Sequence, residues 1–341
     1  MDEAYAQKIE ELLEIGRGQY NEGDWENSIA SFSEIYQLSN RAKDWVYVSF
    51  AAAWLGCAYR EKGDFDSAQN YFQERFNWAQ VLDDFSAKWE VLNWMAELAE
   101  KQENLEEAID YYQGQLILVR LQNISADFEI KIVDRIGRLY FSRKNYALAI
   151  DYLRRSLILA EELSWEKWRA SNLYILADCY RFLENLAGAA DYYREAATVY
   201  RAAEETEQWA LKAWENVKQV CREMGDLTGA IAAEENRLEV FRQREDRSNQ
   251  FFSLYGLGSL FWESREYSRA REYFLLALKM AKQLHAEATE EAQQLVWVKN
   301  LIGNAEYMLG RVEEAMGRVE EAVGSYGRAM EFYQQANNQE W

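Results

Sequence analysis

One phrase of residue types returns roughly every 40 positions along the chain and constrains its fold more than any other feature. A small residue is followed by an aromatic residue three positions later, then by a turn, and then by Ala and an aromatic residue or Leu. Clear copies read Gly56…Tyr59…Gly63-Asp64-Phe65…Ala68…Phe72 and Ala177…Tyr180…Glu184-Asn185-Leu186…Ala189…Tyr193. A fixed period of this size is typical of stacked supersecondary units and argues against one globular core.

Each repeat is predicted to be a helical hairpin, because apolar residues recur three and four positions apart on both sides of each turn. A polar turn residue can accept hydrogen bonds from the unpaired N–H groups that open the second helix. These residues are Asp24, Asp64, Asn104, Asn145, Asn185 and Asp226. Small residues let the two helices approach closely, namely Gly56, Ala96, Gly137, Ala177 and Gly258. The predicted fold class is all-α.

The repeats are expected at about 5–40, 41–81, 82–121, 122–162, 163–202, 203–243, 244–284 and 285–335, in one array over 1–341 with a frayed tail at 336–341. The period breaks near the end, where the turn after Arg265 falls at either Gly310 or Gly317. Residues 317–323 repeat residues 310–316 almost exactly, and seven residues make about two helical turns. We expect a final hairpin with one helix lengthened by this heptad, with the turn left open between the two glycines.

The composition narrows the classes of partner. The chain has 58 acidic and 38 basic residues, a formal charge of −20, which disfavours nucleic acid and anionic lipid because both require neutralised phosphates. Neither a long apolar run nor a secretory leader is visible, so we expect no membrane insertion and a cytoplasmic location. Cys57, Cys179 and Cys221 are interpreted as small buried hydrophobes and not as a disulfide framework.

Residues 55–72, LGCAYREKGDFDSAQNYF, carry a specific resemblance. They match the Leu-Gly…Tyr…Gly-Asp-Tyr…Ala…Phe pattern, so the chain resembles the tetratricopeptide repeat family over roughly residues 5 to 335. The long period and the absence of Pro resemble the subgroup that includes Pins-type adaptors, kinesin light chains and Rap-type proteins. The resemblance implies a right-handed superhelical solenoid of about eight stacked antiparallel hairpins, whose concave wall comes mainly from the first helices.

The family register predicts which side chains line that wall. In the fourth to sixth repeats they are Lys131, Asp134, Arg135, Arg138, Tyr174, Asp178, Arg181, Lys212, Glu215, Gln219 and Arg222. This wall is richer in cations than the whole chain, which would suit an acidic or carboxylate-bearing peptide. The alternative, equally weighted, is that the cations pair with Asp134, Asp178 and Glu215.

The seventh and eighth repeats offer aromatic wall residues, namely Phe251, Tyr255, Trp262, Trp297 and Tyr307, together with Asn300. They could anchor an apolar side chain of a partner, although aromatic residues at helical spacing more often belong to the core. The last helix carries Met330, Phe332, Tyr333 and Trp341, so end-to-end self-association is a further hypothesis.

The sequence offers no catalytic constellation. His285 is the only histidine, and no phosphate loop, nucleophile elbow or complete dinucleotide fingerprint occurs. We therefore expect no enzyme activity, cofactor or metal. The leading interpretation is a protein–protein interaction scaffold, adaptor or assembly factor that binds a partner's peptide or helix in the concave groove. The alternative is a peptide-responsive signalling regulator resembling Rap-type proteins, which carry an additional N-terminal helical domain, whereas the repeats here begin near residue 5.

Overall fold

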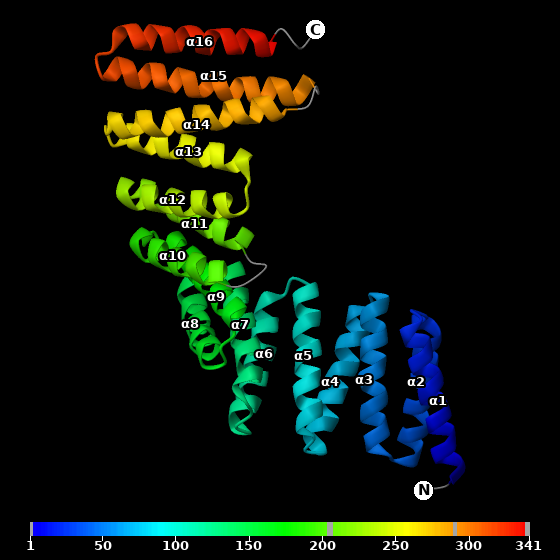
Figure 1. The fold of residues 1–341 in the computed structure, drawn as a ribbon. Coiled ribbons are helices and arrows are strands. Elements are labelled where there is room, and N and C mark those ends of the chain that lie inside the picture. The colour runs from blue at the N-terminus through cyan, green and yellow to red at the C-terminus, as the bar shows by residue number, and fades with distance from the viewer. Residues whose placement is uncertain (1–2, 203–206, 289–291, 338–341) are drawn as a thin grey trace. The chain divides into compact units, whose positions relative to one another are not determined.

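The computed structural model describes residues 3–202, 207–288 and 292–337. The chain divides into two compact units, Met1–Leu159 (unit 1) and Ala160–Trp341 (unit 2). Within the described residues all regular structure is helical (Figure 1). The predictions about Trp341 and most of the tail at 336–341 lie outside the described residues.

Sixteen helices follow one another in the described part of the chain. Those that begin in unit 1 are α1 Glu3–Asn21, α2 Trp25–Ala42, α3 Trp45–Lys62, α4 Phe65–Val81, α5 Phe85–Lys101, α6 Leu105–Leu121, α7 Ala126–Ser142 and α8 Tyr146–Glu162. Unit 2 continues with α9 Glu166–Phe182, α10 Leu186–Ala202, α11 Glu207–Glu223, α12 Leu227–Gln243, α13 Arg247–Glu263, α14 Tyr267–Glu287, α15 Ala292–Ala315 and α16 Val319–Asn337. The all-α prediction is confirmed.

The turns within hairpins form as their residue types predict. The side chain of Asn104 accepts a hydrogen bond from the backbone N–H of Glu107, and Asn145 accepts one from Leu148 at 3.3 Å. The same contact occurs at every predicted cap, including Asp24, Asp64, Asn185 and Asp226. The residue before each cap has a positive φ, for example 87° at Gly63, which is the left-handed conformation that ends a helix. Short-range chemistry therefore fixes these helix boundaries.

Seven of the eight described hairpins place a small residue of the first helix opposite a large one of the second. A Cβ atom added at Gly56 would lie 2.5 Å from the ring of Phe72, and one added at Gly258 would lie 2.7 Å from that of Phe274. Both phenylalanine side chains are fully buried. Gly56 and Gly258 are thus required by packing, as the sequence indicated.

The last hairpin turns at Gly317, whose φ is 76°. Helix α15 consequently has 24 residues where α13 has 17, so the extra heptad lies in the first helix. Gly310 lies against Tyr326, and Gly303 lies against Tyr333 one heptad further along. The duplication therefore adds a second helix–helix contact of the same kind and lengthens the first helix.

Candidate protein-binding surfaces

Helices α1, α3, α4 and α5 of unit 1 line a hollow of about 390 Å³, here called the Trp54 hollow. Its lining residues are Tyr20 from α1, Phe50, Ala53, Trp54, Cys57 and Arg60 from α3, Arg75 from α4, and Glu90 and Trp94 from α5. Four of the nine are aromatic. The volume falls within the range of small ligand sites, and a few polar groups among apolar walls are typical of binding pockets.

Contacts with neighbouring side chains hold the aromatic rings of this hollow in place. The indole of Trp54 stacks on the buried ring of Phe32 at 5.2 Å between centroids, and Trp94 contacts Phe72 at 5.6 Å. The guanidinium of Arg17 lies 5.3 Å from the ring centre of Phe50 and 5.6 Å from that of Trp54. A site with rigid walls loses little conformational entropy when a ligand binds.

The two arginines of the hollow differ in their partners. Arg60 forms ion pairs with Glu61 at 2.9 Å and Glu97 at 3.3 Å. Arg75 donates to the hydroxyl of Ser49 at 2.6 Å, and its Nε is buried without a hydrogen-bond partner among the described residues. Burial lowers the pKa of the Arg75 guanidinium. Arg75 is thus a partly desolvated cation with unused donor capacity.

Sequence reasoning missed this hollow, although a signal was present. The sequence prediction names wall residues only from the fourth repeat onward. The same positions, counted back from the turns of the second and third repeats, include Phe50, Trp54 and Trp94. Arg75 could not have been found this way because it comes from a second helix, α4. Cys57 is only partly buried, and its surroundings raise the pKa of its thiol to about 11, chiefly by desolvation.

The predicted basic residues of α7 have partners on the chain itself. The guanidinium of Arg135 pairs with Glu100, and Arg138 pairs with Asp134 at 2.7 Å. The ammonium of Lys131 lies 5.7 Å from the ring centre of Phe128. Asp134 is 6% exposed, and its pairing with Arg138 agrees with the alternative in which the cations pair with acidic residues of the chain itself.

The predicted residues of α9 and α11 form pairs between successive first helices of unit 2. Arg181 pairs with Glu223 at 2.9 Å, and Arg222 pairs with Glu263 at 2.6 Å. Gln219 also donates to Glu223, at 3.0 Å. These side chains line two hollows of about 600 and 510 Å³, the first of which also has Phe182 and Leu186 in its wall. The arginines are therefore largely neutralised, mostly by glutamates other than those that the sequence suggested.

The other predicted residues of this surface surround Tyr174. The ammonium of Lys212 lies 5.0 Å from the ring centre of Trp209 and 5.5 Å from that of Tyr174. The Tyr174 hydroxyl accepts a hydrogen bond from Asn216 at 2.8 Å. Asp178 accepts one from the hydroxyl of Tyr193, and desolvation raises the pKa of the Asp178 carboxyl. Asp178 therefore joins the two helices of its own hairpin.

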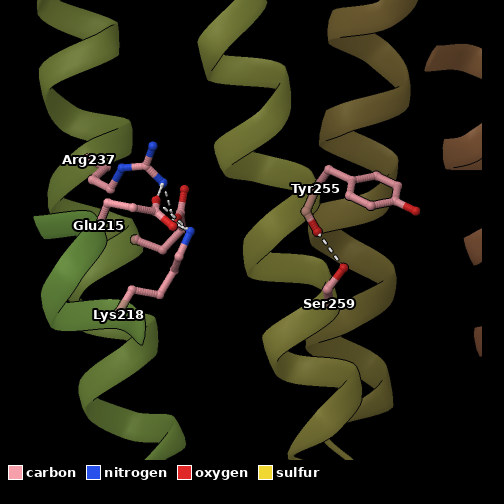
Figure 2. A network of polar contacts seen from close by, with 6 residues as sticks. Glu215, Lys218, Arg237, Tyr255 and Ser259 are labelled. Carbon is pink, nitrogen blue, oxygen red and sulfur yellow. Dashed lines mark hydrogen bonds and ion pairs between the residues drawn. The ribbon is translucent and has the colours of Figure 1, made fainter. Parts of the chain in front are cut away.

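A closed network of four charges lies in the hairpin of α11 and α12 (Figure 2). The Lys218 ammonium contacts Glu215 and Glu234, each at 2.8 Å. Arg237 contacts the same two carboxylates at 2.5 and 2.8 Å. Glu234 is 1% exposed, whereas the side chain of Glu215 is 43% exposed. Of these four residues, the sequence prediction included only Glu215.

The aromatic residues predicted to line the wall in the seventh and eighth repeats lie partly in the core and partly on the surface. Phe251 is 2% exposed, so its placement on the wall was wrong; the neighbouring Phe252 is the exposed ring, at 49%. Tyr255 and Trp262 are partly buried and pack against the core of unit 2, which favours the core interpretation for both. Trp297 and Tyr307 are exposed. One step in helical register, about 100°, is enough to exchange a buried for an exposed side chain.

The described residues contain no group of three or more His, Cys, Asp or Glu side chains placed to hold a metal ion. None of their helices combines the length and the apolar character that crossing a bilayer requires.

Comparisons with known proteins agree with the helical hairpins. Tetratricopeptide repeat models match residues 55–116, 129–202 and 253–284. A curated relative, outer dynein arm-docking complex subunit 4 of Danio rerio, is 24% identical over 144 residues, which are 42% of this chain. The match spans 29% of that relative's length.

Solved structures provide the fold comparison. The C-terminal part of a TPR repeat-containing protein from Cytophaga hutchinsonii has a TM-score of 0.51 at 13% identity, covering 78% of this chain and 94% of that chain. The apo form of RapI has a TM-score of 0.47 at 13% identity and covers 85% and 99%. BtubC from P. vanneervenii has a TM-score of 0.47 at 19% identity and covers 65% and 92%. Given the repeat matches and the hairpins that carry them, this chain belongs to the tetratricopeptide repeat family.

Proposed function

We propose that this protein is a non-enzymatic scaffold that binds a segment of another protein on its first helices, with the Trp54 hollow as an anchor point. The observation that carries the proposal is Arg75, a partly desolvated cation that lines a ring-walled hollow and whose Nε is buried without a hydrogen-bond partner among the described residues. A buried polar atom without a partner is costly unless a ligand supplies one. Aromatic walls together with a guanidinium suit an apolar side chain that stands beside a carboxylate.

The residues predicted from the sequence in α7, α9 and α11 remain proposed contacts. Their ion pairs mean that an acidic segment would compete with glutamates of the chain for most of these cations. Competition of this kind favours selectivity over raw affinity. Among the described residues Arg75 forms no ion pair, although Asp84 and Glu90, which also lines the hollow, act on its charge. We place the anchor there because an incoming carboxylate would not have to displace an existing ion pair.

The test is selection of peptides from a random library against the whole chain, followed by affinity measurements on variants. Phe50→Ala removes a wall of the hollow, and Arg75→Leu removes its unpaired cation while keeping most of the volume. Replacing a desolvated arginine by an apolar residue is expected to leave the fold intact. Phe252→Ala is the matched control because it removes an exposed phenylalanine in unit 2.

We expect selected peptides to bind at least tenfold more weakly to both hollow variants and unchanged to the control, because an anchoring contact of this kind contributes about 1.4 kcal/mol or more. Equal affinity for all four proteins would reject the hollow as the anchor. Hydrogen exchange separates the scaffold from the alternative, a peptide-responsive regulator. A scaffold would show protection confined to the proposed contacts, namely the Trp54 hollow and the predicted residues of α7, α9 and α11, whereas a regulator would also show changed exchange elsewhere in the chain.

A further inference from the structure

The hairpin of α11 and α12 departs from the repeat at two matched positions. Seven residues before the positive-φ turn residue, the other described hairpins have a small residue: Gly16, Gly56, Ala96, Gly137, Ala177, Gly258 and Gly310. Nine residues after it, they have an aromatic residue or Leu: Phe32, Phe72, Tyr112, Leu153, Tyr193, Phe274 and Tyr326. The corresponding residues around Gly225 are Lys218 and Glu234.

The two departures depend on each other. A glutamate as buried as Glu234 requires cations beside it, and Lys218 provides one at 2.8 Å in addition to Arg237, whereas a glycine at position 218 would provide none. Yet a buried ion pair is rarely better for stability than the apolar contact that it replaces. Stability therefore does not account for the exchange, and another role for the charges has to be sought on the surface that they face.

The two carboxylates of the network differ in their exposure to solvent. Glu234 is 1% exposed and contacts both cations, so it orients Lys218 and Arg237 from the buried side of the network. Glu215 contacts the same two cations from the side of the 510 Å³ hollow, which Lys218 also lines. With 43% of its side chain exposed, Glu215 can rotate into water at small cost, whereas Glu234 cannot.

We propose that Lys218 and Arg237, oriented by Glu234, form a receptor for a carboxylate of an acidic partner segment, and that Glu215 occupies this receptor when no partner is bound. When Glu215 rotates away, Lys218 and Arg237 have only the carboxylate of Glu234 as a partner. A carboxylate of the partner segment can then accept hydrogen bonds from the N–H groups that Glu215 has left and restore the charge balance. The other charged residues of the hollow are already paired, Arg222 with Glu263 and Glu223 with Arg181. The inference rests on the proposed role as a binding scaffold but concerns a different surface from the Trp54 hollow.

The test uses the full chain and a fluorescein-labelled peptide of alternating glutamate and serine, with fluorescence anisotropy measured at low ionic strength. The matching peptide with glutamine in place of glutamate reports binding that does not need carboxylates. Glu215→Gln removes the internal competitor. Glu223→Gln is the matched control, because it removes the same charge from the same hollow but releases Arg181 instead of Lys218 and Arg237. It therefore measures the gain from freeing a single wall arginine. The double variant Lys218→Ala, Glu234→Phe replaces the network by the small–aromatic pair of the other repeats.

We expect Glu215→Gln to bind the glutamate peptide about tenfold more tightly than the wild type, the factor expected if Glu215 occupies the receptor about nine-tenths of the time. Glu223→Gln should change affinity much less, and the double variant, checked for helicity and melting temperature, should lose the binding. The proposal is overturned if Glu215→Gln binds no better than Glu223→Gln, if the glutamine peptide binds equally well, or if no protein binds the glutamate peptide. Every variant keeps the Trp54 hollow, so a failure here leaves the test of that anchor unaffected.

Discussion

Replacing Gly56 by alanine should destabilise unit 1, although the same change stabilises most helices. Alanine is favoured over glycine inside a helix by about 1 kcal/mol. At Gly56, however, the new methyl group would lie 2.5 Å from two ring atoms of Phe72. That ring is fully buried in a cluster with Val91, Met95 and Leu98, so it cannot move without disturbing its neighbours. Overpacking of this kind costs about 1–3 kcal/mol, and the net loss should therefore reach about 2 kcal/mol.

Gly18→Ala is the matched control, because Gly18 lies in α1 with no atom within 4 Å of the added Cβ. It should stabilise the protein by up to about 1 kcal/mol, so the same substitution should have opposite signs at the two positions. Urea unfolding followed by circular dichroism gives both values, and hydrogen exchange shows whether the loss at Gly56 is centred on α3 and α4. If Gly56→Ala proves as stabilising as Gly18→Ala, the close contact with Phe72 is refuted.

Three further predictions concern caps, pH and buried charge. Asn145→Ala should cost about 1 kcal/mol in urea unfolding by removing the cap of α8, whereas Asn145→Asp should retain most of the stability. Burial raises the pKa of the Cys57 thiol to about 11, so the neutral thiol stabilises the folded state fully below the ordinary pKa near 9, and this contribution is lost as the pH rises through 11. The melting temperature should therefore fall faster between pH 8 and pH 11 for the wild type than for Cys57→Ala. Glu234→Gln should destabilise the protein, by less than the about 3–5 kcal/mol of a fully unpaired buried charge, because Lys218 and Arg237 keep Glu215 as a partner. Lys218→Ala combined with Glu234→Phe should be at least as stable as the wild type in urea unfolding, and a double variant less stable than the wild type would contradict this.

The parts of the fold that the sequence predicted correctly depend on residues close together in the chain. Asn145 caps a helix whose N–H donor lies three residues later, and Gly56 meets Phe72 within one hairpin. Such contacts return in most of the repeats, so the copies support one another. The candidate site was less accessible to sequence reasoning because binding residues do not repeat. Lys218 and Glu234 were visible as departures from the repeat, but Arg75 reaches its hollow from a second helix that the wall register does not include.

By itself, the sequence determined the class of fold, the hairpins and their caps, because turn chemistry and helical periodicity act over a few residues. It could not place the turn of the last hairpin, since Gly310 and Gly317 both satisfy the local pattern; packing of the whole helix pair decided for Gly317. It also could not tell free cations from paired ones. Arg181 and Glu223 are 42 positions apart, and only the rotation between neighbouring hairpins brings them within 2.9 Å. Charges that looked like a binding surface in the sequence are, in the tertiary structure, mostly each other's partners.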